Sequence, residues 1–102
     1  MLVVTNRLPL GKPLDPELIA AIQNDFIPSM RRQPGFVSFQ LVRNSDSEAV
    51  VIVVYRDQAA MREIGRSVAS PWFQSHVVSY LSGEGQRTVG ELVCSFIGGL
   101  YK

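Results

Sequence analysis

The chain has 102 residues, 46% of them hydrophobic, and this length and composition fit one domain over residues 1–102 with a single core. Ten Lys and Arg residues against nine Asp and Glu residues give a net charge of +1 without a basic patch, which excludes a nucleic-acid-binding role. The single cysteine excludes an intramolecular disulfide bond, and no secretory signal or run of about 18 apolar residues is present, so we expect a cytoplasmic protein that does not enter a membrane.

Residues 2–8 predict a β-strand, because their side chains alternate between two faces and most of them are apolar. One face carries Leu2, Val4, Asn6 and Leu8. Asn6 is therefore a polar side chain in an otherwise apolar row, which we expect to face the helices. A buried asparagine needs partners for its carbonyl and amino groups, so Asn6 is either bonded to loop backbone or directed at a ligand.

A first helix is predicted to begin at Asp15-Pro16-Glu17, which supplies a capping side chain, a proline at the first helical position and an acid in the first turn. Apolar side chains then recur at helical spacing, at Ile19, Ile22, Phe26 and Met30. Pro28 interrupts this stripe, and we expect it to bend or tighten the last turns.

Two strands follow, over residues 36–43 and 49–55, and residues 44–47 form the loop of a hairpin. The second strand, AVVIVVY, has no polar group until the tyrosine hydroxyl, which predicts a strand covered on both faces. Helices of so small a domain can cover one face only. The sheet of a second copy is the simplest cover for the other face, so the sequence predicts a homodimer.

A second helical region is predicted to begin after Asp57 and to restart at Ser70-Pro71, ending near residue 81. Residues 88–98 predict a last strand, in which we expect Cys94 to be a small buried hydrophobic residue. The order of elements is βαββαβ. It predicts an α+β, ferredoxin-like fold, a four-stranded antiparallel sheet with two helices on one face.

The segment SPWFQSHVVSY, residues 70–80, contains the only tryptophan and the only histidine of the chain. His76 is the candidate base or metal ligand, because its unperturbed pKa lies near neutrality; the alternative is a helix-face histidine satisfied by hydrogen bonds. A lone histidine cannot complete a zinc site, but it can be the axial ligand of a haem iron. Trp72 is interpreted as packing. Further candidate pocket residues are Tyr55, Tyr80, Arg7, Arg66 and Arg87.

Three stretches, VVTNRLPLGKP, RRQPGFVSFQLVR and SPWFQSH, together resemble the antibiotic biosynthesis monooxygenase (ABM) domain family over essentially the whole chain, and its IsdG-type haem-degrading members most closely. This resemblance implies a dimeric ferredoxin-like fold whose two sheets form an α/β barrel. It also implies that His76 ligates a haem iron and that Asn6 lies on the distal oxygen side. The sequence departs from these members at the tryptophan that distorts the porphyrin, whose place falls at about Ser67.

The resemblance leaves three functions open. The first is haem binding and degradation, with Asn6 and His76 as the site residues and the haem iron on His76. The second is cofactor-independent oxygenation of an aromatic or quinol small molecule, with His76 as base and Asn6 as hydrogen-bond donor to enolate charge. The third is a dimeric small-molecule-binding module without turnover.

Overall fold

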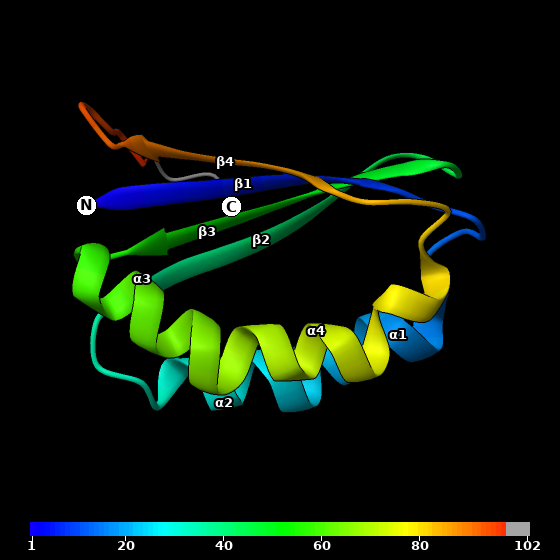
Figure 1. Cartoon of the computed structure of the whole chain (residues 1–102), viewed down its shortest axis with the longest axis horizontal. Helices are drawn as coiled ribbons and strands as arrows, with labels where there is room; N and C mark the ends of the chain where they lie inside the picture. The colour runs from blue at the N-terminus through cyan, green and yellow to red at the C-terminus, as the bar shows by residue number, and fades with distance from the viewer. Residues whose placement is uncertain (98–102) are drawn as a thin grey trace.

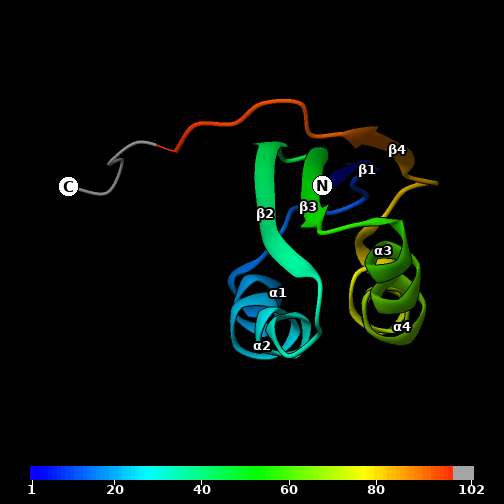
Figure 2. The same cartoon turned by 90° about the vertical axis from the view of Figure 1, so that its left-hand side faces the viewer.

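The computed structural model describes residues 1–97 and arranges them in two layers, a β-sheet and a layer of helices (Figure 1). The sheet is antiparallel and four-stranded, with the strand order β2-β3-β1-β4. Its strands are β1 (Leu2–Pro9), β2 (Phe36–Ser45), β3 (Glu48–Tyr55) and β4 (Gln86–Glu91). The helices lie against one face of the sheet and leave the other without a helix (Figure 2). The predicted ferredoxin-like α+β fold is therefore confirmed.

Each long helix consists of an α-helical segment, a π-helical turn and a second α-helical segment. The first comprises α1 (Pro16–Ala21), η1 (Ile22–Phe26) and α2 (Ile27–Arg31). The second comprises α3 (Gln58–Ile64), η2 (Gly65–Ala69) and α4 (Ser70–His76), and the short 3-10 turn η3 (Val78–Tyr80) follows it. Both predicted caps are confirmed, because Asp15 accepts a hydrogen bond from the N–H of Leu18 and Asp57 accepts one from the N–H of Ala60. Within residues 1–97 no helix is long and apolar enough to cross a membrane.

Each π-helical turn lies just before a proline, Pro28 in the first helix and Pro71 in the second. Proline has no N–H to donate, and its ring excludes the carbonyl group four residues before it. The backbone therefore widens into a π turn, in which the N–H of Ile27 bonds to the carbonyl of Ile22. We expected a bend or a tighter turn at Pro28, and the structure shows a wider turn instead.

The core lies between the helices and the sheet, where Leu8, Met30 and Ile64 are almost completely buried. Tyr80 and Asp15 form a hydrogen-bonded pair next to this core. The hydroxyl of Tyr80 donates to the two carboxylate oxygens of Asp15, at 2.9 and 2.8 Å. These bonds join the end of the second helical region to the cap of the first, and Tyr80 therefore has a structural position rather than one in a pocket.

The face of the sheet without helices is apolar along its centre. The side chains of Val3, Val50, Ile52 and Val54 point to this face and are half-buried. Val42 extends this surface on β2 and is 41% exposed. Residues 49–55 are thus apolar on both faces of the sheet, as predicted. In the described chain the helices cover one of these faces.

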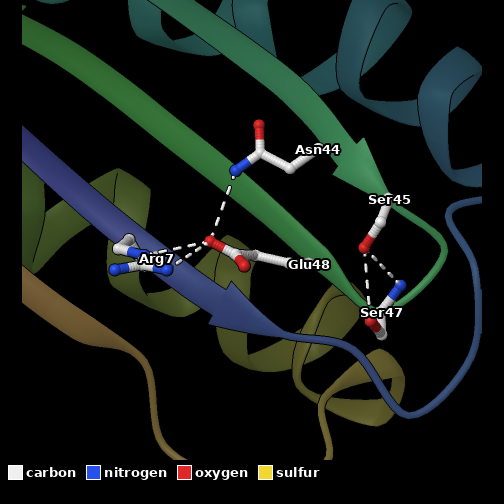
Figure 3. Close-up of polar contacts among 5 residues, drawn as sticks. All are labelled: Arg7, Asn44, Ser45, Ser47 and Glu48. Carbon is white, nitrogen blue, oxygen red and sulfur yellow. Dashed lines mark hydrogen bonds and ion pairs between the residues drawn. The ribbon is translucent and has the colours of Figure 1, made fainter.

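Arg7 also points to this face, and it joins β1 to the β2–β3 hairpin (Figure 3). Its Nη2 atom lies 2.8 Å from Oε2 of Glu48, and Nδ2 of Asn44 donates to the same oxygen at 3.3 Å. These two partners hold the pKa of the Glu48 carboxyl below its ordinary value, Arg7 having the larger effect. Arg7 is accordingly not one of the residues under the helices.

The last strand is shorter than predicted, because β4 ends at Glu91, opposite the beginning of β1. One further bond joins the N–H of Leu92 to the carbonyl of Met1, and beyond it no strand remains to pair with. The prediction that Cys94 is buried is wrong, since it is exposed on this unpaired segment. Position 98, the end of the predicted strand, lies outside the described residues.

Gly35 is predicted to be essential to the turn between α2 and β2. Its φ angle is +94°, and an added Cβ would lie 2.5 Å from the Cβ of Ala60. Replacement Gly35→Ala should lower the free energy of unfolding by about 2 kcal/mol, measured by urea denaturation. Gly90→Ala is the control, because its added Cβ meets nothing within 4 Å, and we expect a change below about 0.5 kcal/mol. Equal stability losses in the two variants would contradict this explanation.

Candidate functional site

A cavity of about 740 Å³ lies between the sheet and the helices. This volume is within the usual range for small-molecule sites, about 300–1,000 Å³. Most of its lining is apolar and comes from β1, β3 and both long helices. The residues with polar groups that line it are Asn6, Tyr55, Arg62, Arg66, Ser70, Trp72, Gln74 and Arg87. The cavity therefore suits a largely apolar ligand that carries a few polar groups.

Asn6 lies in the sheet wall of this cavity, between the buried side chains of Val4 and Leu8 on the same face of β1. Its Oδ1 atom is buried and has no hydrogen-bond partner in the described part of the chain. The loop before β4 encloses this oxygen, since a Cβ added to Gly85 would lie 2.5 Å from it. With the oxygen enclosed, the amino group is the part of the amide that a ligand in the cavity can reach. An unpaired amide in an apolar wall is what a ligand-binding asparagine requires.

Tyr55 is a second polar residue of the sheet wall and is only 4% exposed. Burial raises the pKa of its hydroxyl above the ordinary value, and the nearby positive charge of Arg87 opposes this shift in part. The hydroxyl therefore stays protonated at neutral pH. A neutral tyrosine can donate a hydrogen bond to a ligand oxygen, and no residue among 1–97 takes this bond in the structure.

Aromatic rings from β2 and both helices form one wall. The rings of Phe26 and Phe39 meet edge to face at 5.2 Å, and the rings of Phe26 and Trp72 lie 4.9 Å apart. The indole Nε1 of Trp72 donates to Oδ2 of Asp25 at 2.7 Å, which links α4 to η1. Trp72 was interpreted as packing, and the structure places it in the cavity wall as well.

His76 lies on the outer side of Trp72. Its ring stacks on the indole with centroids 3.9 Å apart and an angle of 11° between the planes. Its Nδ1 lies 3.1 Å from the carbonyl oxygen of Trp72 and, facing an acceptor, donates to it. His76 is exposed and is not among the residues that line the cavity. The structure thus brings Asn6, Tyr55, Arg66 and Arg87 to one cavity and leaves His76 outside it.

The role of haem ligand that the resemblance implies for His76 does not fit this arrangement. An axial histidine has to project an imidazole nitrogen into the cavity, whereas the only imidazole of the chain packs behind Trp72. Ser67, near the place of the family's tryptophan, is exposed and donates its hydroxyl to the carbonyl of Glu63 at 2.7 Å. In residues 1–97 no group of three or more His, Cys, Asp or Glu side chains could hold a metal ion.

The polar edge of the cavity was missed by the sequence analysis, apart from two of its arginines. It is built from Arg62, Arg66, Ser70 and Gln74 on the second helix and Arg87 on β4. The helical members are spaced four residues apart and therefore fall on one side of the helix. This four-residue spacing is visible in the sequence and could have indicated a polar side of the helix. Gly85 left no comparable signal, because its role depends on the packing of a loop against Asn6.

The sequence and the fold were compared with known proteins. Residues 1–75 match the sequence profile described as "Antibiotic biosynthesis monooxygenase" (ABM). No curated protein matches the chain. Among solved structures, the monooxygenase ActVA-Orf6 of Streptomyces coelicolor, in complex with nanaomycin D, is 18% identical to this chain, with a TM-score of 0.76. The match covers 95% of this chain and 91% of the ActVA-Orf6 chain.

Two further structures share the fold. SnoaB, a cofactor-independent oxygenase from Streptomyces nogalater, is 18% identical at a TM-score of 0.67, covering 99% of this chain and 97% of its own. A mutant of MhuD with two manganese protoporphyrin IX molecules per active site is also 18% identical, at a TM-score of 0.72, covering 96% of this chain and 100% of its own. At these identities the likeness is one of fold.

The position of His76 predicts the outcome of a haem titration. Because its ring lies outside the cavity, haemin added to the parent protein and to His76→Ala should give the same absorption spectrum around the Soret band. A saturable Soret shift in the parent, at one haem per chain and lost in the variant, would contradict this placement. Circular dichroism of both proteins checks that the variant is folded.

Proposed function

The chain belongs to the antibiotic biosynthesis monooxygenase family, and from this premise we propose that it is a cofactor-independent oxygenase of a polycyclic phenol or quinol. The observation that carries this proposal is the unpaired amide of Asn6 in the wall of an aromatic-lined cavity. The solved structures with this fold include one described as a cofactor-independent oxygenase, which supports the same class of reaction.

Oxygenation of this kind needs neither a metal nor a reductant. In an anthrone, the methylene carbon becomes a carbonyl carbon with one atom of O₂, and its two hydrogens leave with the other oxygen atom as water. The carbon loses four electrons and O₂ gains four, so the reaction is balanced. It begins when the substrate loses a proton, because the resulting enolate is the species that reduces O₂.

The protein's part is to stabilise that anion. Neither a carboxylate nor an imidazole lines the cavity within residues 1–97, so the proton passes to water. The amino group of Asn6 then donates a hydrogen bond to the enolate oxygen, whose charge is greater than that of the neutral substrate. Tyr55, kept protonated by burial, is a second donor on the sheet side. Donors placed in an apolar cavity stabilise such charge more strongly than water does.

The shape of the cavity supports a planar aromatic substrate. Phe26, Phe39 and Trp72 present ring faces and edges to it. Aromatic rings in such offset or edge-to-face arrangements attract one another by about 0.5–1.5 kcal/mol beyond the burial of their area. His76 contributes indirectly, since its stacking and its hydrogen bond to the Trp72 carbonyl support the indole from outside.

The direct test of this function is oxygen uptake with anthrone as the probe substrate, followed by the absorbance of the quinone. Asn6→Ala should lower kcat by about a hundredfold, the effect of removing one oxyanion donor. The melting temperature of this variant should not fall, because Oδ1 of Asn6 has no partner to lose. The matched control is Asn44→Ala on the exposed hairpin, whose kcat should stay within about twofold of the parent.

Two outcomes would contradict the proposal. Unchanged turnover in Asn6→Ala would remove Asn6 from the reaction. No turnover by the parent with a panel of phenols and quinols, combined with a lower melting temperature in Asn6→Ala, would favour the binding module without activity that the sequence left open.

The proposal includes a homodimer formed through the face of the sheet without helices. Val3, Ile52 and Val54 point to this face, and contiguous apolar surface of this kind is typical of subunit interfaces. The segment after β4 adds further apolar surface, with Val93, Phe96 and Ile97 between 83% and 91% exposed. It leaves β4 on the side of the sheet opposite the helices (Figure 2). A second copy covers both surfaces with the same side chains.

Ile52→Glu should therefore convert the dimer into a monomer, because it places a charge in the centre of the apolar face. Sedimentation equilibrium should give twice the chain mass of 11.3 kDa for the parent and the single mass for the variant. Gln23→Glu adds the same charge on the exposed side of η1 and should remain dimeric. A monomeric parent, or a dimeric Ile52→Glu variant, would contradict this interface.

A further inference from the structure

The charged side chains that line the cavity are all positive. Arg62, Arg66 and Arg87 all line the cavity, and no Asp or Glu is among the residues that line it. Arg62 and Arg66 are one helical turn apart on the second helix, and Arg87 reaches the cavity from β4. Figure 2 shows β4 on the same side of the molecule as α3 and α4. Three arginines, two from the second helix and one from β4, therefore line a largely apolar cavity.

Two of these arginines are without a carboxylate partner in residues 1–97. Arg66 is paired, because its Nη2 lies 2.8 Å from Oε1 of Glu63 and 2.9 Å from Oε2. Arg62 and Arg87 make neither an ion pair nor a side-chain hydrogen bond with a described residue, whereas Arg7 and Arg56 on other parts of the surface are paired. Arg62 and Arg87 thus carry positive charge at the cavity that no carboxylate of residues 1–97 compensates.

Resting on the proposed function, we propose that the substrate carries a carboxylate apart from its reacting ring, and that Arg62 and Arg87 bind this carboxylate at the edge of the cavity. A guanidinium group binds a carboxylate through two parallel N–H groups, and such charge-assisted hydrogen bonds are about twice as strong as neutral ones. The apolar part of the ligand lies against the aromatic wall, which leaves the carboxylate at the polar edge.

The arrangement also explains how the substrate is oriented. A planar aromatic ligand held by ring contacts alone can turn over within the cavity, because such contacts fix its plane better than its direction. An anionic group bound at one edge removes this freedom and decides which ring atoms come near Asn6 and Tyr55. The substrate class is therefore an aromatic carboxylic acid with a phenol or quinol ring.

The experiment compares two ligands that differ in this group alone, anthracene carboxylate and anthracenemethanol. Their binding to the parent protein is measured at low salt by quenching of Trp72, the only tryptophan of the chain. The carboxylate should bind about tenfold more tightly than the alcohol, and added salt should weaken the binding of the carboxylate alone. Arg62→Gln and Arg87→Gln should each weaken carboxylate binding about three- to tenfold and change alcohol binding less than about twofold.

Arg31→Gln is the matched control, because Arg31 is exposed on α2 and does not line the cavity. It should leave both affinities unchanged. Equal affinities of the parent for the two ligands, or equal loss of both affinities in the arginine variants, would overturn the proposal. So would the absence of saturable binding by either ligand. Binding is measured without turnover, so a carboxylate preference that persists while anthrone is not oxidised would contradict the proposed reaction and uphold this inference.

Discussion

The central strand β1 is hydrogen-bonded on both edges, to β3 and to β4, so it cannot twist out of the sheet or shift its register. Alternate side chains are therefore fixed beneath the helices, and Asn6 is one of them. A one-residue shift would place Asn6 on the other face and remove its amide from the sheet wall of the cavity. The site thus depends on a backbone register, which a strand paired on both sides enforces more firmly than a loop would.

The π turns of both long helices contribute residues to the cavity wall. Each helix contains a proline that cannot donate a backbone hydrogen bond, and each widens into a π turn before it. In the second helix this turn begins at Gly65, where an added Cβ would meet nothing within 4 Å. Gly65 therefore leaves room at the cavity wall that a larger side chain would fill. Gly85 has the opposite role, since it lies against the amide oxygen of Asn6 and leaves the amino group as the accessible part of the amide.

The fold could be predicted from local patterns. The caps at Asp15 and Asp57, the period-two strands and the helical stripes are all consequences of interactions close in sequence. The end of β4 was not predictable in this way, because it depends on where β1 begins. The prediction that Cys94 is buried was wrong for the same reason, because Cys94 lies beyond the part of β4 that pairs with β1.

The site could be predicted only in part. The parity of β1 placed Asn6 correctly on the helical face, since it follows from alternation alone. The direction of His76 was not accessible, because it is decided by stacking on Trp72, which in turn is held by Asp25 from another helix. Such contacts depend on how the two helices pack, and no spacing in the sequence records them.

The most direct measurement is the side-chain amide resonance of Asn6 in isotope-labelled protein, assigned by its loss in Asn6→Ala. Addition of anthraquinone, the product of the proposed reaction with anthrone, should shift this resonance in a saturable way, because the amino group is the part of Asn6 that a ligand in the cavity reaches. The ring resonances of His76 should move little. A static Asn6 amide together with a large shift at His76 would show that the ligand binds elsewhere and would contradict the account.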